Sequence, residues 1–192
     1  MAAYLSIAPE ATQVLFADLQ DEIVARSVTN TPPSLVRSAT VLAQLAHLFS
    51  LPVTLSLVPA GPRSPVPVAE LAAVTTAAPR VVRTTISPFL DAETTATLAS
   101  HGRPTLLLAG VATEMVVLHT VVSAVAAGYR ALVVVDACGG WSPRTEEAAW
   151  RQLVAAGGEL TSTLTLATAL EPDLATPRGQ QLLGLLQQLR LT

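Results

Sequence analysis

The fold is decided by residues 104–136, which read PTLLLAGVATEMVVLHTVVSAVAAGYRALVVVD. Two short apolar runs, at 104–110 and 130–136, flank a segment of helical length that ends at Gly128. Apolar runs of this length are typical of strands that are buried on both faces of a sheet. A strand, a helix and a second strand in this order predict a right-handed crossover between two parallel strands.

The same alternation of strands and helices extends through most of the chain. We predict further strands at residues 12–18, 51–57, 80–85 and 159–166, and helices at residues 34–49, 91–101, 113–127, 146–156 and 179–189. Ser34 is the expected N-cap of the first of these helices, and the proline-rich stretch at 58–67 is an expected loop. The pattern predicts an α/β fold, a three-layer α/β/α sandwich with a six-stranded, mainly parallel sheet of Rossmann-type topology.

Length and composition limit the possible classes of protein. The 192 residues suit a single domain over residues 1–192, with a core at about 12–169 and a C-terminal helix at about 179–190. The net charge is −3, the 11 basic residues are all arginine and no basic run occurs, so nucleic acid is not an expected partner. There is neither an uninterrupted apolar stretch of about 18 residues nor a secretory signal pattern, so we expect a cytoplasmic protein with no membrane partner.

Three places in the predicted fold lie where a ligand is expected. In open α/β sheets the ligand crevice lies beyond the carboxyl ends of the strands, where the strand order reverses. Asp18 ends the first predicted strand, Arg83 lies near the end of the third, and residues 110–116 follow the fourth. We therefore expect an acid, a cation and a helix N-terminus to face one cleft, where free backbone N–H groups would bind an anion or a developing oxyanion.

The motifs around the fourth and fifth strands point to a family. Residues 110–117 (GVATEMVV), 124–129 (AVAAGY) and 133–138 (VVVDAC) resemble the isochorismatase-like cysteine hydrolases. Weaker matches are FADLQ at 16–20, RTTISPF at 83–89 and AAW at 148–150, and the last two look most like the YcaC-like branch of the family. The resemblance runs from about residue 12 to residue 169 and implies the same fold, a substrate that is a small amide or ester, and a homo-oligomer.

The resemblance also implies roles for individual residues. Members of this family use an aspartate base, a lysine and a nucleophilic cysteine, with two backbone N–H groups as oxyanion donors. It places the aspartate at Asp18, a cis peptide bond between Val111 and Ala112, and the donors at the N–H groups of Ala112 and Val116. The lysine position falls on Arg83. The cysteine position falls on Val116, because the family pattern Gly-x-Ala-Thr-Glu-x-Cys-Val aligns here without a gap.

These replacements change the expected chemistry. The side chain of Val116 has no lone pair and no ionisable proton, so it cannot form a covalent intermediate. Arg83 keeps the positive charge, and Asp18 beside it is expected to be ionised. The leading hypothesis is a homologue that has lost cysteine-dependent hydrolysis and acts as a small-molecule binder or an oligomeric scaffold. The alternative is an active hydrolase of a small amide or ester that uses Asp18 with an activated water or another nucleophile.

Three other residues carry a potential nucleophile, and each also has a structural interpretation. Cys138 is the only cysteine, and a cysteine in an apolar stretch is usually an inert core residue. Thr113 and Ser87 are remote alternatives that would need Asp18 as their base. The residues that we expect near the pocket are Gln20, Phe89, Thr113, Glu114 and His119. Trp141 could line a pocket, but core or interface packing is its default interpretation. Glu114 is expected to favour the helix N-terminus electrostatically.

We expect neither a metal nor a cofactor. In the nicotinamidase branch of the family a histidine-containing metal site follows the second strand, whereas residues 56–67 contain no histidine or aspartate. No glycine-rich nucleotide motif follows the first strand, which argues against a dinucleotide binder. The helix predicted at 113–127 is apolar around nearly all of its circumference. We therefore expect one side to cover the sheet and the other to form the interface of a homo-oligomer.

Overall fold

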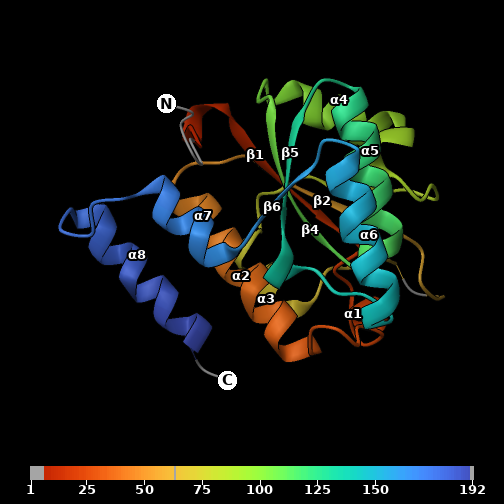
Figure 1. The fold of residues 1–192 in the computed structure, drawn as a ribbon, viewed down its shortest axis with the longest axis horizontal. Coiled ribbons are helices and arrows are strands. Elements are labelled where there is room, and N and C mark those ends of the chain that lie inside the picture. Colours follow the sequence, from red (N-terminus) through yellow and green to blue (C-terminus); the bar gives the residue numbers. More distant parts are fainter. Residues whose placement is uncertain (1–6, 63, 191–192) are drawn as a thin grey trace.

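The computed structural model describes residues 7–62 and 64–190. Its sheet contains six strands: β1 (Thr12–Ala17), β2 (Val53–Leu57), β3 (Arg80–Val82), β4 (Thr105–Gly110), β5 (Arg130–Val134) and β6 (Glu159–Thr161). The strands pair in parallel, and Figure 1 shows the sheet between two groups of helices. The predicted α/β fold is confirmed, with a sheet that is parallel throughout rather than mainly parallel.

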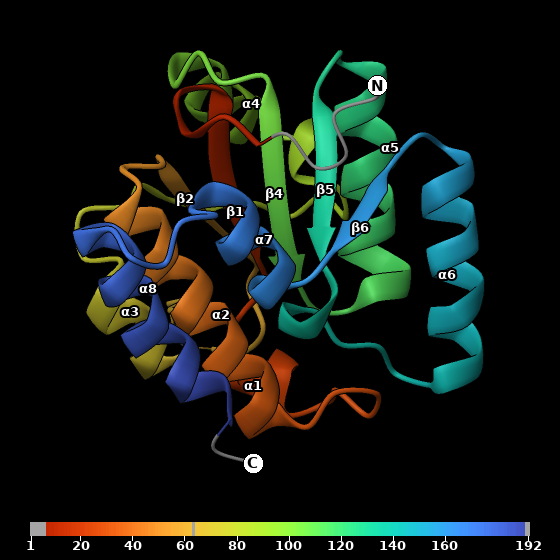
Figure 2. The same ribbon diagram turned by 60° about the vertical axis from the view of Figure 1, so that its left-hand side comes forward.

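The helices form the two outer layers. They are α1 (Asp21–Val24), α2 (Pro32–Leu48), α3 (Ala69–Val74), α4 (Ala92–Ser100), α5 (Leu118–Ala126), α6 (Pro143–Ala155), α7 (Thr163–Leu170) and α8 (Pro177–Gln187). Short 3-10 turns are Pro9–Ala11, Pro88–Leu90, Val135–Ala137 and Gln188–Arg190, and a π-helical turn, Thr113–Val117, leads into α5. Helices α2, α7 and α8 cover one face of the sheet, and α4, α5 and α6 cover the other (Figure 2).

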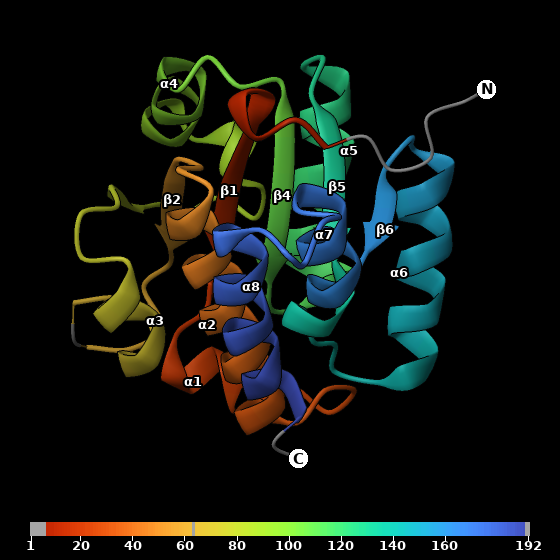
Figure 3. The ribbon, with the colours of Figure 1, turned by 90° about the vertical axis from the view of Figure 1, so that its left-hand side faces the viewer.

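The order of the strands fixes the place of the ligand crevice. Across the sheet the order is β3-β2-β1-β4-β5-β6, which is the Rossmann-type arrangement. Figure 3 shows β2, β1, β4, β5 and β6 in this order. From β1 the chain adds β2 and then β3 on one side of the sheet. It then returns to the other side of β1, where it adds β4, β5 and β6 in turn. The reversal therefore lies between β1 and β4, and the segments that follow these two strands flank it.

Side chains of the central strands alternate between two cores. In β1, Val14 and Phe16 face the core under α2, whereas Leu15 and Ala17 face the core under α5. All six residues of β1 are buried. Because each central strand places side chains in both cores, its sequence is a continuous apolar run. Such runs made the central strands easy to predict.

Three expectations about local structure are wrong. The strand predicted at 159–166 ends at Thr161, because Ser162 accepts a hydrogen bond from the backbone N–H of Thr165 and caps α7. Ser34 lies inside α2, whose N-cap is Thr31, since the prolines at 32 and 33 occupy the first helical positions. The strand predicted at 80–85 ends at Val82. Helices α1 and α3 were not predicted, because they are too short for a periodic pattern to show.

The outer side of α5 lies at the surface. Val121 and Ala124 are buried against the sheet, whereas Val122 is 45% exposed and His119 is exposed one turn earlier. Within the described part of the chain, no helix combines the length and the apolar character needed to cross a membrane.

Candidate functional site

Asp18 lies where β1 ends, at the reversal of the strand order. Its φ angle is 59°, in the left-handed region, which aspartate adopts more readily than most non-glycine residues. Its backbone N–H donates to the carbonyl of Ser56 in β2, with a distance of 2.9 Å between the nitrogen and oxygen atoms. The left-handed turn directs the chain away from the sheet and leaves the Asp18 carboxyl group at the carboxyl edge of the strands.

Arg83 neutralises this carboxyl group. Its Nη2 atom lies 2.7 Å from Oδ1 of Asp18, its Nε donates to Oγ of Ser56 at 2.8 Å, and its Nη1 donates to the carbonyl of Thr85. The Arg83 side chain is 1% exposed, so a guanidinium with fewer partners would be costly at this depth. The fork of donors thus joins the segments that follow β1 and β3 to β2.

Burial controls the protonation of Asp18. It raises the pKa of Asp18 to about 6, and the Arg83 guanidinium, which lowers the pKa, offsets only part of this effect. The expected ionised form therefore dominates at pH 7, but with a pKa above its usual range rather than below it. A carboxyl group with this pKa exchanges its proton close to neutral pH.

The segment after β4 forms the opposite wall. The peptide bond between Val111 and Ala112 is cis, at the position that the family resemblance implies. Gly110 lies so close to β1 that a Cβ atom on it would stand 2.5 Å from the carbonyl oxygen of Ala17. Glycine at this position allows the turn to approach the end of β1. The following π-helical turn brings Val116 toward Asp18.

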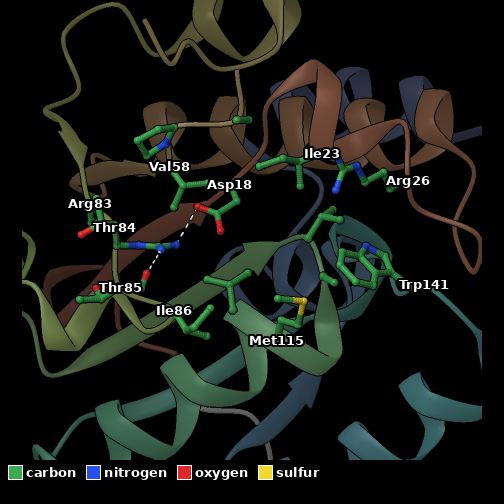
Figure 4. A pocket seen from close by; sticks show the side chains of 15 residues that line it. Asp18, Ile23, Arg26, Val58, Arg83, Thr84, Thr85, Ile86, Met115 and Trp141 are labelled. Atoms are coloured by element: carbon green, nitrogen blue, oxygen red, sulfur yellow. Dashed lines mark hydrogen bonds and ion pairs between the residues drawn. The ribbon is translucent and has the colours of Figure 1, made fainter. Parts of the chain in front are cut away.

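These two walls enclose a cavity of about 440 Å³. The residues that line it are Asp18, Ile23, Arg26, Val58, Pro59, Ala60, Arg83, Thr84, Thr85, Ile86, Val111, Ala112, Met115, Val116 and Trp141. Figure 4 shows the Asp18–Arg83 pair among the side chains that line it, with Met115, Ile86 and Trp141 around it. The volume is in the range of small-molecule sites, and most of the lining side chains are apolar.

The structure brings together Asp18, Arg83, Val111, Ala112 and Val116 around this cavity. These are the residues to which the family resemblance assigns the acid, the cation, the oxyanion donors and the nucleophile position. Their convergence follows from the parallel sheet, because the carboxyl ends of β1, β3 and β4 meet at one edge.

The five expected pocket residues do not line the cavity. Gln20 exchanges two hydrogen bonds of 2.9 Å with the backbone of Val58 and thereby fixes the loop after β2. Phe89 packs edge-on against Tyr129, with 5.4 Å between the ring centroids. The contacts with Val58 and with Tyr129 direct these two side chains away from the cavity.

The other three expected pocket residues point away from it as well. Thr113 donates to Glu146 of α6 at 2.7 Å, and Glu114 accepts a hydrogen bond from the backbone N–H of Trp141 at 2.9 Å. Both side chains face α6 and the loop before it, so Glu114 holds this loop in place. His119 is exposed on the outer side of α5. The helical turn after Val116 carries it to the surface instead of the cleft.

The alternative nucleophiles also lie outside the lining. Cys138 is buried, and burial raises the pKa of its thiol far above the ordinary value. Ser87 donates to Oγ of Ser123 at 3.1 Å and is itself 2% exposed. Thr113 is fully buried and bonded to Glu146. None of the three is placed to receive a substrate in this cavity.

Two further residues lie at the mouth of the cavity. Sequence reasoning missed Arg26, which follows α1. Trp141 precedes α6 and lines the cavity, which was the alternative to its default interpretation as a core or interface residue. The edge rule itself contains the signal for Trp141, because the loop after β5 starts at the same edge of the sheet. Arg26 gives no such signal, since α1 was not predicted. Among the described residues, no cluster of three His, Cys, Asp or Glu side chains is arranged to hold a metal ion.

Known proteins resemble this chain in sequence and in fold. The YcaC protein of Escherichia coli (strain K12), named a probable hydrolase, is 28% identical over 172 residues, which cover 88% of this chain and 82% of the relative. The structure of YcaC from Pseudomonas aeruginosa with hexane-2,5-diol and covalent acrylamide is 26% identical, with a TM-score of 0.89, and the match covers 96% of this chain and 93% of that one.

A second solved structure is similarly close. The E. coli YcaC crystal structure, described as an octameric hydrolase of unknown specificity, is 26% identical with a TM-score of 0.87, and the match covers 98% of this chain and 91% of that one. The family model of the isochorismatase domain matches residues 12–165, which include β1, β4 and the cavity between them. The chain therefore belongs to the isochorismatase family.

Proposed function

We propose that this protein keeps the isochorismatase fold and cleft but has lost cysteine-dependent hydrolysis, and that it acts as a small-molecule binder or an oligomeric scaffold. One observation carries the proposal. Val116, at the position that the resemblance assigns to the nucleophile, lines the cavity beside the Asp18–Arg83 pair. An isopropyl group cannot add to a carbonyl carbon, so the covalent step of the family has no partner here.

No other thiol replaces it. Cys138 is the only cysteine of the chain, is 1% exposed and does not line the cavity. Because burial raises the pKa of its thiol, the reactive thiolate is not populated near neutral pH. The remaining acceleration would come from positioning and the oxyanion donors, on the order of 10³-fold over water.

The direct test is turnover. We expect the wild-type protein to show no turnover above this residual level against panels of small amides and esters. Val116→Cys, which restores a thiol beside Asp18, is the matched gain-of-function variant. Wild-type turnover that Asp18→Ala abolishes would contradict the loss of hydrolysis.

Thiol labelling gives a second readout that does not need the substrate. Acrylamide alkylates thiolates, and the P. aeruginosa relative is known with covalent acrylamide. We expect the wild-type protein to remain unmodified in intact-mass spectra and Val116→Cys to be modified. Met115→Cys is the control, because it places a thiol in the same cavity at a neighbouring position. Labelling of the wild type at Cys138 would remove the basis for calling that thiol inert.

The scaffold role rests on the exposed apolar side of α5. Val122 is 45% exposed there, and the E. coli relative is described as octameric. We expect light scattering after size exclusion to give a mass of several subunits, and Val122→Arg to lower it. Val28→Arg, on a loop before α2 and also exposed, is the control. A monomeric wild-type protein at micromolar concentration would exclude the scaffold role.

A second candidate function is hydrolysis through Asp18 and an activated water. The pKa of Asp18, raised to about 6, favours it, because a general base works best when its pKa lies near the operating pH. This function predicts wild-type turnover that rises with pH through about 6 and is lost in Asp18→Asn. It also predicts indifference to alkylating reagents, since no thiol takes part.

A further inference from the structure

The described residues that line the cavity carry an unbalanced positive charge. Those with charged side chains are Asp18, Arg83 and Arg26, and the first two neutralise each other in an ion pair of 2.7 Å. Across residues 7–62 and 64–190, the Arg26 guanidinium has no ion pair and no hydrogen-bond partner. A cation that lines a cavity without a partner is available to an anionic ligand.

The position of Arg26 defines one end of the cavity. Arg26 is exposed and so is Trp141, which is 45% exposed, whereas Val116 and Asp18 are buried. Figure 4 shows Arg26 on the same side of the cavity as Trp141 and close to Ile23. The cavity therefore has an outer end with a cation and an indole ring, and an inner end with Asp18 and Val116.

The two ends of the cavity differ in whether they favour an anionic group of a ligand. An anionic group at the inner end would meet the Asp18 carboxylate, whose counter-ion Arg83 is already engaged in the ion pair. The same group at the outer end would meet Arg26, and a guanidinium group can hold a planar carboxylate through two parallel hydrogen bonds. The apolar side chains between the ends, among them Met115 and Ile86, favour an uncharged body.

We propose that the cavity binds a small monocarboxylate with an apolar body, whose carboxylate is held by Arg26 and whose body packs between Trp141 and Met115. The inference rests on the proposed binding function and names its ligand class. A second carboxylate on the ligand weakens binding, because it would lie near Asp18.

The test uses Trp141 as the reporter. Tryptophan occurs only at positions 141 and 150, so Trp150→Phe leaves Trp141 as the single indole. In this background, 3-phenylpropionate and 3-phenylpropionamide are titrated at pH 7.5 with excitation that selects tryptophan. The two probes have the same shape and differ in charge. We expect the carboxylate to bind about tenfold more tightly than the amide, as is typical of a charge-assisted contact.

Three variants separate Arg26 from general electrostatics. Arg26→Gln is expected to bring the two affinities together without weakening the amide, and Arg26→Lys to keep part of the preference. Arg144→Gln removes the same charge from an exposed position on α6 outside the cavity, and it is expected to keep the full preference. Unchanged amide binding in Arg26→Gln also shows that the variant folds.

Several results would overturn the assignment. One is equal affinity of the two probes in the wild-type background. Another is no saturable carboxylate binding up to 10 mM, a concentration roughly at the weak limit of specific binding. The third is an equal loss of the preference for the carboxylate in Arg26→Gln and Arg144→Gln. Each leaves the loss of hydrolysis untouched, because turnover is measured separately. Conversely, wild-type turnover would refute the proposed function while the preference for the carboxylate stands.

Discussion

Replacing Arg83 with methionine leaves the Asp18 carboxyl group buried without its counter-ion. The Arg83 side chain is 1% exposed, so water does not readily take the place of the guanidinium. Methionine has an unbranched, apolar side chain that fills much of the same space. The change therefore removes charge and hydrogen bonds with little loss of packing. The oxygen atoms of Ser56 and Thr85 lose their donor as well.

The size of the effect depends on whether Asp18 is ionised. Removing one partner of a buried ion pair costs about 3–5 kcal/mol, because the other charge remains buried. We expect this loss in the free energy of unfolding at pH 8. At pH 5 the variant can protonate Asp18, so the cost falls to that of the unsatisfied acceptors, about 1–3 kcal/mol.

The direction of the pH dependence follows from linkage. The pKa of Asp18 is about 6 in the folded state, against 3.8 for the ordinary side chain, so folding takes up a proton between these values. The free energy of unfolding therefore falls as the pH rises from about 4 to about 6. Arg83 lowers the folded pKa, so its removal extends this fall to higher pH. The difference between wild type and variant thus grows above pH 6.

Urea unfolding at pH 5 and pH 8, followed by circular dichroism, measures this difference directly. The control is the double variant Asp18→Asn/Arg83→Met, which removes both charges and should recover most of the loss at pH 8. An equal loss at both pH values, or a larger loss at pH 5, would refute the reasoning. So would a double variant no more stable at pH 8 than Arg83→Met alone.

Three further changes test the local structure by urea unfolding. Gly110→Ala places a Cβ atom 2.5 Å from the Ala17 carbonyl oxygen and should cost about 1–3 kcal/mol as overpacking; a neutral result would mean that β1 and β4 separate easily. Asp136→Ala removes the acceptor, at 2.8 Å, of the backbone N–H of Thr163 at the start of α7 and should cost about 1 kcal/mol. Arg151→Ala removes an exposed pair on α6 and should change stability by less than about 0.5 kcal/mol, so a large loss would point to a buried role.

The fold was predictable where the residue pattern of a segment fits only one kind of secondary structure. The runs at β1, β4 and β5 are apolar on both sides, which fits only a central strand of a covered sheet. The segment ELTSTLTL at 159–166 alternates like a strand, but its polar alternate residues also suit a helix with a serine cap. The local pattern does not distinguish a strand from a helix with a serine cap. The contacts of α7 with the core favour the helix.

The site was predictable for residues that directly follow a strand, because the carboxyl ends of the strands meet at one edge of the sheet. Asp18, Arg83 and the turn at 110–116 were expected to converge, and they line one cavity. The five further pocket candidates lie near these residues in sequence, but nearness along the chain says little about the direction of a side chain. Glu114, for example, holds the loop of Trp141 although it is two residues from Val116.

The presence of Asp18 and Arg83 is weak support for catalysis, because the pair has a structural role of its own. Arg83 joins Asp18 after β1, Ser56 in β2 and Thr85 after β3, so it holds together the ends of three neighbouring strands. A chain without activity would still need these contacts to keep that edge of the sheet closed. The side chain at position 116 forms no such contact through a polar atom. A thiol there would serve only chemistry, so that position discriminates between a hydrolase and a binder better than the ion pair does.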